Sequence, residues 1–127
     1  MSNKIQETIR IEVARMYNLL HMNRDDISEV CELSYFIRNC LVPYTSNRDP
    51  AKLIPTVMFI WLRHHNYLVK WEEIVQYTSP TKKEFKNFLI AFYESFPFEC
   101  IMEEVIEIYM EYVSRAFDMV NKMRQFS

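Results

Sequence analysis

The sequence of 127 residues contains no glycine. At the average frequency of roughly 7%, about nine would be expected. Glycine supplies the positive φ angles of tight turns and lets a backbone approach a ligand closely. Without it the chain has no phosphate-binding P-loop, no G-x-G-x-x-G dinucleotide turn and no G-x-S-x-G nucleophile elbow. Tight β-hairpins are also disfavoured, because their turns use Asn-Gly or Gly-X. We therefore expect helices joined by Pro, Asn, Asp and Ser, in a protein that binds rather than catalyses.

The bulk composition is that of one globular domain. Half of the residues are hydrophobic and 15% are aromatic, which is too apolar for a disordered chain and sufficient for a sizeable core. The apolar run from Leu53 to Leu62 is broken by Pro55 and is too short to span a membrane. The three cysteines are widely spaced, so we expect buried free thiols in a reducing compartment. The formal net charge of −2 argues against strong non-specific binding to nucleic acid.

Apolar residues recur at helical spacing in six segments, and no segment alternates convincingly with the period of a β-strand. The first four predicted helices cover about residues 5–20, 26–42, 50–62 and 69–77. A fifth begins at a Ser79-Pro80 cap, and a sixth covers about residues 98–124. We therefore predict an all-α fold, a compact orthogonal bundle of five to six helices with a long C-terminal helix. Residues 1–24 are expected to form an N-terminal helix that packs on the core, and residues 25–127 a single helical domain.

The third predicted helix begins at Asp49-Pro50, an N-cap followed by proline at the first helical position. Its residues from Val57 to Leu62 are apolar on nearly every face, as expected of a central buried helix. Pro55 is expected either to kink this helix or to mark its true start.

The last predicted helix is longer than a domain of this size needs. Its apolar residues step by four and three and so form a heptad-like seam. The seam residues are Phe98, Met102, Val105, Tyr109, Tyr112, Ala116, Met119 and Met123. We expect this seam to pack inside the domain. The alternative is that its C-terminal half protrudes and binds a partner, including a second copy of the chain.

The stretch from Asp49 to Phe96 resembles a cyclin-like repeat, of the kind found in transcription factor TFIIB. The matching segments are DPAKLIPTVMFIWLRHHN, LVKWEEIVQYT and SPTKKEFKNFLIAFYESF. In that family a buried helix is entered through a proline, a short T-x-x-E-I-x-x-x-T helix follows, and the next helix is entered through S-x-x-E. The residues that fit these patterns here are Glu73, Ile74, Thr78, Ser79, Lys83, Glu84 and Phe85. The resemblance extends over about residues 25–120 if the flanking helices are the first and fifth of the repeat.

This resemblance implies a cyclin-like fold and a non-enzymatic adaptor subunit in a nuclear transcription-initiation or DNA-replication assembly. Such a subunit acts by docking to the protein subunits of a larger complex, without a cofactor and without a membrane. One alternative is a cyclin-type regulatory subunit of a cyclin-dependent kinase, although residues 30–41 do not supply the usual first-helix box of those cyclins. A small helical apoptosis modulator of the Bcl-2 kind is another, although its N-W-G-R signature needs a glycine.

The fourth and fifth predicted helices also have the pattern of a helix-turn-helix, which gives a weak DNA-binding protein as a further alternative. The N-terminal side chains of a recognition helix face the base edges. The candidate residues for contact with a partner or DNA are Lys70, Trp71, Lys82, Lys83 and Lys86. Residues 46–90 carry a net charge of only +3, so we expect any DNA contact to be weak.

The start of the last predicted helix is acidic. Glu103, Glu107 and Glu111 follow one another at intervals of four residues, where like charges repel on a helix. A basic partner surface would relieve this repulsion, so we predict an acidic partner-binding face. An ordinary solvated face near a helix N-terminus, where the macrodipole favours acids, is the alternative.

No residue pattern indicates catalysis or metal binding. His64 and His65 are adjacent and so point about 100° apart on a helix, and the chain has no H-E-x-x-H spacing. Cys31 and Cys40 lie on nearly opposite faces of one predicted helix, where they cannot share a metal. We therefore expect no catalytic residue, no metal and no cofactor.

Overall fold

The computed structural model describes residues 2–41 and 48–125, and all regular structure within them is helical. The α-helices are α1 (Ser2–Leu19), α2 (Ile27–Leu41), α3 (Pro50–His64), α4 (Trp71–Val75), α5 (Lys82–Ser95) and α6 (Met102–Gln125). Short 3₁₀ turns, Arg24–Asp26 and Glu99–Ile101, precede α2 and α6. The all-α class and the long last helix are therefore confirmed.

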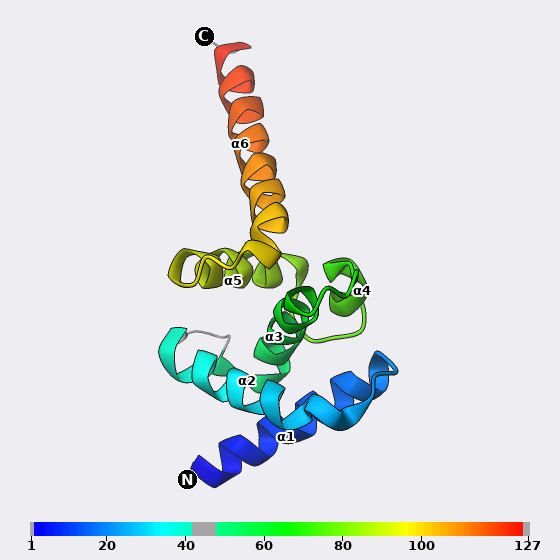
Figure 1. The fold of residues 1–127 in the computed structure, drawn as a ribbon. Coiled ribbons are helices and arrows are strands. Elements are labelled where there is room, and N and C mark those ends of the chain that lie inside the picture. Colours follow the sequence, from blue (N-terminus) through cyan, green and yellow to red (C-terminus); the bar gives the residue numbers. More distant parts are fainter. Residues whose placement is uncertain (1, 42–47, 126–127) are drawn as a thin grey trace.

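Helix α3 lies at the centre of the molecule, as Figure 1 shows. Helices α1 and α2 pack against each other and against one side of α3, while α4 and α5 lie on the other side. Helix α6 starts beside α5 and rises away from the rest of the chain, so that the C-terminus lies far from the body formed by α1–α5 (Figure 1). The buried Ile9, Val13 and Tyr17 of α1 belong to the hydrophobic core that α1 shares with the other helices.

The predicted central helix is confirmed. Every residue from Leu53 to Leu62 is buried, as expected for a helix covered on all sides. Asp49 caps its N-terminus by accepting a hydrogen bond from the amide of Ala51 at 3.1 Å. The helix runs from Pro50 without a break, so Pro55 lies inside it and does not mark its start.

Two helix ends need the left-handed conformation and obtain it without glycine. His21, after α1, has φ 54°, and Asn66, after α3, has φ 65°. At each end the next amide bonds back five residues: Met22 N to Tyr17 O, and Tyr67 N to Leu62 O, both at 2.9 Å. This is the Schellman arrangement, which usually places glycine at the left-handed residue.

Helix α5 begins two residues later than the predicted Ser79-Pro80 cap. Thr81 is the N-cap: its hydroxyl accepts from the amide of Glu84 at 3.1 Å, and the Glu84 carboxylate accepts from the amide of Thr81 at 3.0 Å. These two bonds form a capping box. Phe85, Phe88, Leu89 and Phe92 are buried, as their spacing predicted.

The expectation that the seam of the last helix packs inside the domain is wrong. Val105 and Ile108 of α6 are buried, together with Ile101 just before it, but all of residues 113–125 are exposed. A helix of 24 residues is about 36 Å long at 1.5 Å per residue. Helix α6 crosses α5 and then rises away from it (Figure 1), so the second half of α6 has no element of the described chain beside it to pack against.

Candidate docking site

The clearest candidate site is an exposed apolar strip along α6, which we call the α6 seam. It consists of Met102, Ile106, Tyr109, Val113, Ala116, Val120 and Met123. Their spacing alternates between four and three residues, which puts all of them on one face of the helix. Apart from Ala116, the exposed fractions of these residues range from 39% at Tyr109 to 70% at Met123. Met110 and Phe117 on one flank and Met119 on the other widen this surface, and all three are more than 60% exposed.

The seam faces solvent because the other apolar face of α6 is buried in the body. Val105 and Ile108 join the core, and Tyr112 packs on it at the last point of contact. Tyr112 and Val113 are consecutive residues, so they point about 100° apart on a helix. The body therefore holds one face of α6 and leaves the seam exposed, apart from the hydroxyl of Tyr109, which bonds to Glu94 of α5.

Three polar contacts join the first half of α6 to α5. Lys86 Nζ lies 2.9 Å from Glu111 Oε2, the Tyr109 hydroxyl donates to Glu94 Oε1 at 2.9 Å, and the Tyr112 hydroxyl donates to Asn87 Oδ1 at 3.0 Å. The two tyrosine hydroxyl bonds are exposed, at the edge of the bundle. Together the three contacts fix the direction in which α6 leaves the body.

A nearly buried ion pair anchors the base of α6. Arg63 Nη1 of α3 lies 2.5 Å from Glu104 Oε1, and their side chains are only 21% and 9% exposed. Arg63 also donates from Nε to the carbonyl of Val69 at 3.0 Å and lies over the ring of Phe59. Neither Arg63 nor Glu104 was among the site residues predicted from the sequence. The sequence feature that points to this pair is Arg63, a charged residue at the end of an otherwise apolar helix.

The predicted basic residues fall into two groups. Lys70, Lys82 and Lys83 are exposed. Lys86 is only 15% exposed in its side chain, because Glu111 pairs with it and the ring of Trp71 lies 5.4 Å from its ammonium group. Trp71 is half-buried and stacks on Phe85, with ring centroids 5.4 Å apart. Lys86 and Trp71 therefore support the joint between α5 and α6, whereas the other three lysines can reach a partner.

The predicted acidic face is divided in the same way. Glu103 and Glu107 are exposed, whereas Glu111 binds both Lys86 and Arg115, at 2.9 and 2.8 Å. The hydrogen bond from Lys86 lowers the pKa of Glu111, which keeps its carboxylate ionised. The sequence placed Lys86 and Glu111 on two separate surfaces, and the fold brings them together.

Basic charge on the first turn of α5 is also partly balanced. Lys52 Nζ of α3 lies 2.6 Å from Glu84 Oε2, and this bond is the main reason why the pKa of Glu84 is lowered. Lys86 and Lys52 are paired to carboxylates, whereas Lys82 and Lys83 at the start of α5 and Lys70 before α4 are exposed. So small a positive surface makes few phosphate contacts, and salt-dependent DNA binding scales with their number.

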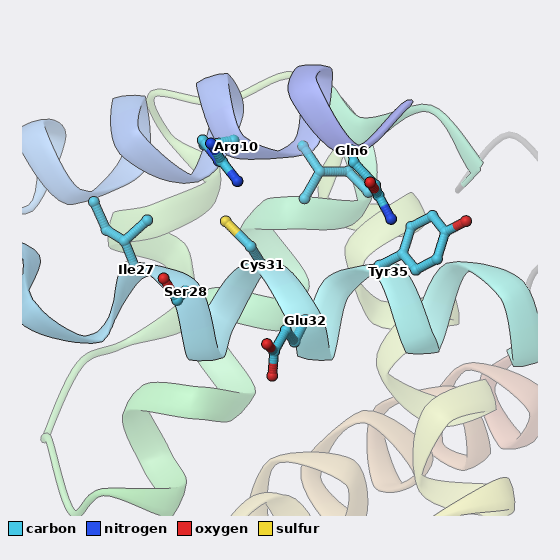
Figure 2. A pocket seen from close by; sticks show the side chains of 8 residues that line it. Gln6, Arg10, Ile27, Ser28, Cys31, Glu32 and Tyr35 are labelled. Carbon is cyan, nitrogen blue, oxygen red and sulfur yellow. The ribbon is translucent and has the colours of Figure 1, made fainter. Parts of the chain in front are cut away.

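A small cavity of about 260 Å³ lies between α1 and α2. Figure 2 shows Gln6 and Arg10 of α1 across from Cys31 and Tyr35 of α2. Burial raises the pKa of the Cys31 thiol, whereas a nucleophilic cysteine needs a lowered one. All three cysteines are free thiols, as expected. The expectation that they are buried is wrong, because Cys31 and Cys100 are only half-buried and Cys40 is exposed.

Within residues 2–41 and 48–125, no group of three or more His, Cys, Asp or Glu side chains is placed to hold a metal ion. None of the helices in the same part of the chain is both long and apolar enough to cross a membrane.

No protein-family model, no curated protein and no solved structure matches the sequence or the fold.

Proposed function

We propose that this protein is a non-enzymatic adaptor that docks to other protein subunits, and that α6 is its main docking element. One observation carries the proposal: half of a 24-residue helix stands clear of the body with its large apolar side chains uncovered. Contiguous apolar surface of this kind marks interaction sites on soluble proteins. An amphipathic helix that buries one face against a partner is a common mode of recognition.

The energy of such docking comes from the exposed apolar area. Phe117, Met119 and Met123 are each at least 65% exposed. Burying a side chain of this size contributes roughly 1.5–3 kcal/mol. Several such residues on one helix supply enough to hold a partner after the entropic cost of association.

The exposed lysines at the α4–α5 edge form a second, weaker surface. Lys70, Lys82 and Lys83 lie near the start of α4 and α5, where they favour an acidic patch on a neighbouring subunit or the phosphates of nearby DNA. Charges at the rim of an interface mainly raise the association rate and add specificity. This surface would therefore orient a partner that α6 holds.

The resemblance of residues 49–96 to a TFIIB-type repeat supports a finer version of the proposal. In that version the bundle is cyclin-like, and the adaptor belongs to a nuclear transcription-initiation or DNA-replication assembly. The buried, proline-entered α3 and the short α4 before α5 are in keeping with it. A regulatory subunit of a cyclin-dependent kinase would use the same docking chemistry, and its kinase would appear among the captured partners.

The test is affinity purification of the tagged full-length chain from its own cells, followed by mass spectrometry. The variant V113E/V120E places two charges in the α6 seam, on exposed residues that are not among those in or packed against the core. The control S114E/N121E adds the same charges at adjacent exposed positions outside the seam. We expect wild type and control to retain the same partner proteins and the seam variant to lose them. Equal recovery of all partners by the seam variant would overturn the proposal.

A further inference from the structure

The α6 seam has the residue pattern of a two-stranded coiled coil. Ile106, Val113 and Val120 recur every seven residues, at the positions of the heptad named a. Tyr109, Ala116 and Met123 occupy the d positions between them. Apolar residues at a and d, sustained over successive heptads, bring two helices together by knobs-into-holes packing. Because these residues are exposed in the monomer, a second helix has access to the full seam.

We propose that the seam is occupied by a second copy of α6 in antiparallel orientation. This inference rests on the proposed docking role of α6: other subunits then bind the paired helices of the dimer, and not the seam of a single chain. The result is a symmetric homodimer in which the two helices form a coiled coil between the two bodies. An interface of this kind is isologous and closed, since each copy offers the same surface to the other. It therefore stops at two copies.

The antiparallel register follows from the heptad positions. In an antiparallel pair, a residues of one helix meet d residues of the other. One register pairs six of the seven seam residues and leaves out Met102: Ile106 meets Met123 of the second copy, Tyr109 meets Val120, and Val113 meets Ala116. In this register the flanking Met110 also lies against Phe117 of the second copy. The same contact therefore covers part of the apolar surface beside the seam.

Charge selects the antiparallel orientation over the parallel one. The exposed acids of the first half of α6 are Glu103 and Glu107, because Glu104 and Glu111 pair with Arg63 and Lys86 of the same chain. The second half carries Arg115, Lys122 and Arg124 beside one acid, Asp118. An antiparallel pair places the acidic half of each helix against the basic half of the other. In the register above, Glu103 lies across from Arg124 of the second copy. A parallel pair would bring the acidic halves, and both bodies, to the same end.

Pairing also accounts for the helical form of the second half of α6. Residues 113–125 have no element of the body beside them. Isolated helices of this length are marginal in water, because nucleation is costly and tertiary packing supplies most helical stability. A second copy of α6 supplies that packing.

The experiment is sedimentation equilibrium of the purified full chain over a wide range of concentrations. We expect wild type to reach twice the 15.5 kDa of the monomer and the control S114E/N121E to match it. The seam variant V113E/V120E should dissociate at least about a hundredfold more readily, because four carboxylates enter an apolar interface. Circular dichroism checks that the body of the variant stays folded. A wild type that remains monomeric at every concentration would overturn the proposal.

A charge exchange tests the orientation. In the antiparallel dimer, E103K alone replaces both ion pairs by Lys–Arg pairs. R124E alone replaces both ion pairs by Glu–Glu pairs. Each variant should dimerise about tenfold more weakly, since two ion pairs become repulsive. Mixing the two variants restores both pairs, so the mixture should form heterodimers of wild-type affinity. A mixture no tighter than either variant alone would exclude the antiparallel register.

The two proposals fail separately. If the chain is monomeric but the seam variant loses its cellular partners, the homodimer is wrong and the docking role stands. If the chain is dimeric through the seam but captures the same other proteins with and without the seam charges, the homodimer stands and the docking role is wrong.

Discussion

Glu104 and Arg63 form the strongest single contact between α6 and the rest of the molecule. Their side chains are 9% and 21% exposed, and the second carboxylate oxygen of Glu104 has no hydrogen-bond partner among the described residues. Removing one member of a buried ion pair leaves the other charge uncompensated, which is more damaging than replacing both.

We therefore predict that Glu104→Gln lowers the free energy of unfolding by about 3 kcal/mol, at the low end for a buried pair because Arg63 keeps some solvent contact. Urea denaturation of the purified chain measures this. Glu107 is exposed and has no partner in the proposed dimer, so Glu107→Gln is the matched control and should leave stability nearly unchanged. Equal effects of the two substitutions would show that the Arg63–Glu104 pair does not anchor α6.

Tyr17 makes stability depend on alkaline pH. Its side chain is fully buried. Burial, with the nearby carboxylates of Asp26 and Glu29, raises the pKa of Tyr17 from 10.0 to about 12. The unfolded chain therefore releases this proton at a lower pH than the folded chain, and the stability that Tyr17 contributes is lost as the pH rises from 10 towards 12.

The substitution Tyr17→Phe should remove this dependence. Between pH 10 and 12, wild type should lose up to about 1.4 kcal/mol per pH unit relative to the variant. At neutral pH the variant should be at least as stable as wild type, because the Tyr17 hydroxyl is buried without a partner among the described residues. Denaturation curves of both proteins across this pH range measure the difference. If wild type and variant lost the same free energy of unfolding as the pH rises, Tyr17 would ionise as readily in the folded state as in the unfolded one.

At the scale of single elements, the helix ends show how the chain manages without glycine. His21 and Asn66 both hold the left-handed conformation, with φ 54° and 65°. Asparagine tolerates this conformation through its short polar side chain, whereas for most other residues it costs roughly 1–2 kcal/mol.

Replacing His21 by glycine should raise the free energy of unfolding by about 0.5–1 kcal/mol, since the relief of backbone strain exceeds the added entropy of the unfolded chain. His21→Ala keeps the strain and should not stabilise the protein. Thermal unfolding of the two variants beside wild type is the measurement. A His21→Gly variant that is less stable than His21→Ala would mean that the His21 side chain itself supports the turn.

Element positions were predictable where local signals were strong. The apolar run from Leu53 to Leu62 and the cap at Asp49 located α3, and the spacing of Phe85, Phe88 and Phe92 located the buried face of α5. The start of α5 was displaced by two residues because Ser79 and Thr81 are both acceptable N-caps. The reciprocal hydrogen bonds between Thr81 and Glu84, which form the capping box in the folded chain, make Thr81 the N-cap.

The two apolar faces of α6 could not be assigned from the sequence. The predicted seam combined Val105, which is buried, with Met119 and Met123, which are exposed. Both the face that enters the core and the face that points away have heptad-like spacing, so periodicity alone does not distinguish them. The difference arises because α6 crosses α5 and then leaves the body, so that only its first half has other elements beside it (Figure 1).

At the scale of the whole molecule, the candidate surfaces depend on which charges the fold pairs. Lys86 and Glu111 lay on separate predicted surfaces, and they form a contact of 2.9 Å between α5 and α6. Sequence separation hides such pairs, because residues 25 positions apart meet only once both helices have packed. Of the charged residues that were predicted from the sequence as site residues, Lys70, Lys82, Lys83, Glu103 and Glu107 are exposed in the fold.

The second half of α6 should be exposed to solvent in the monomer and buried in the homodimer or in the complex with partner proteins. Amide hydrogen exchange followed by mass spectrometry measures this directly. At dilutions where the chain is monomeric, we predict rapid exchange in residues 113–125 and protection in residues 102–112, which the body holds. At concentrations where the chain pairs, or in the purified complex with its partners, residues 113–125 should become protected as well. Protection of residues 113–125 that is the same at every dilution would show that this half packs against its own body, and would contradict the account.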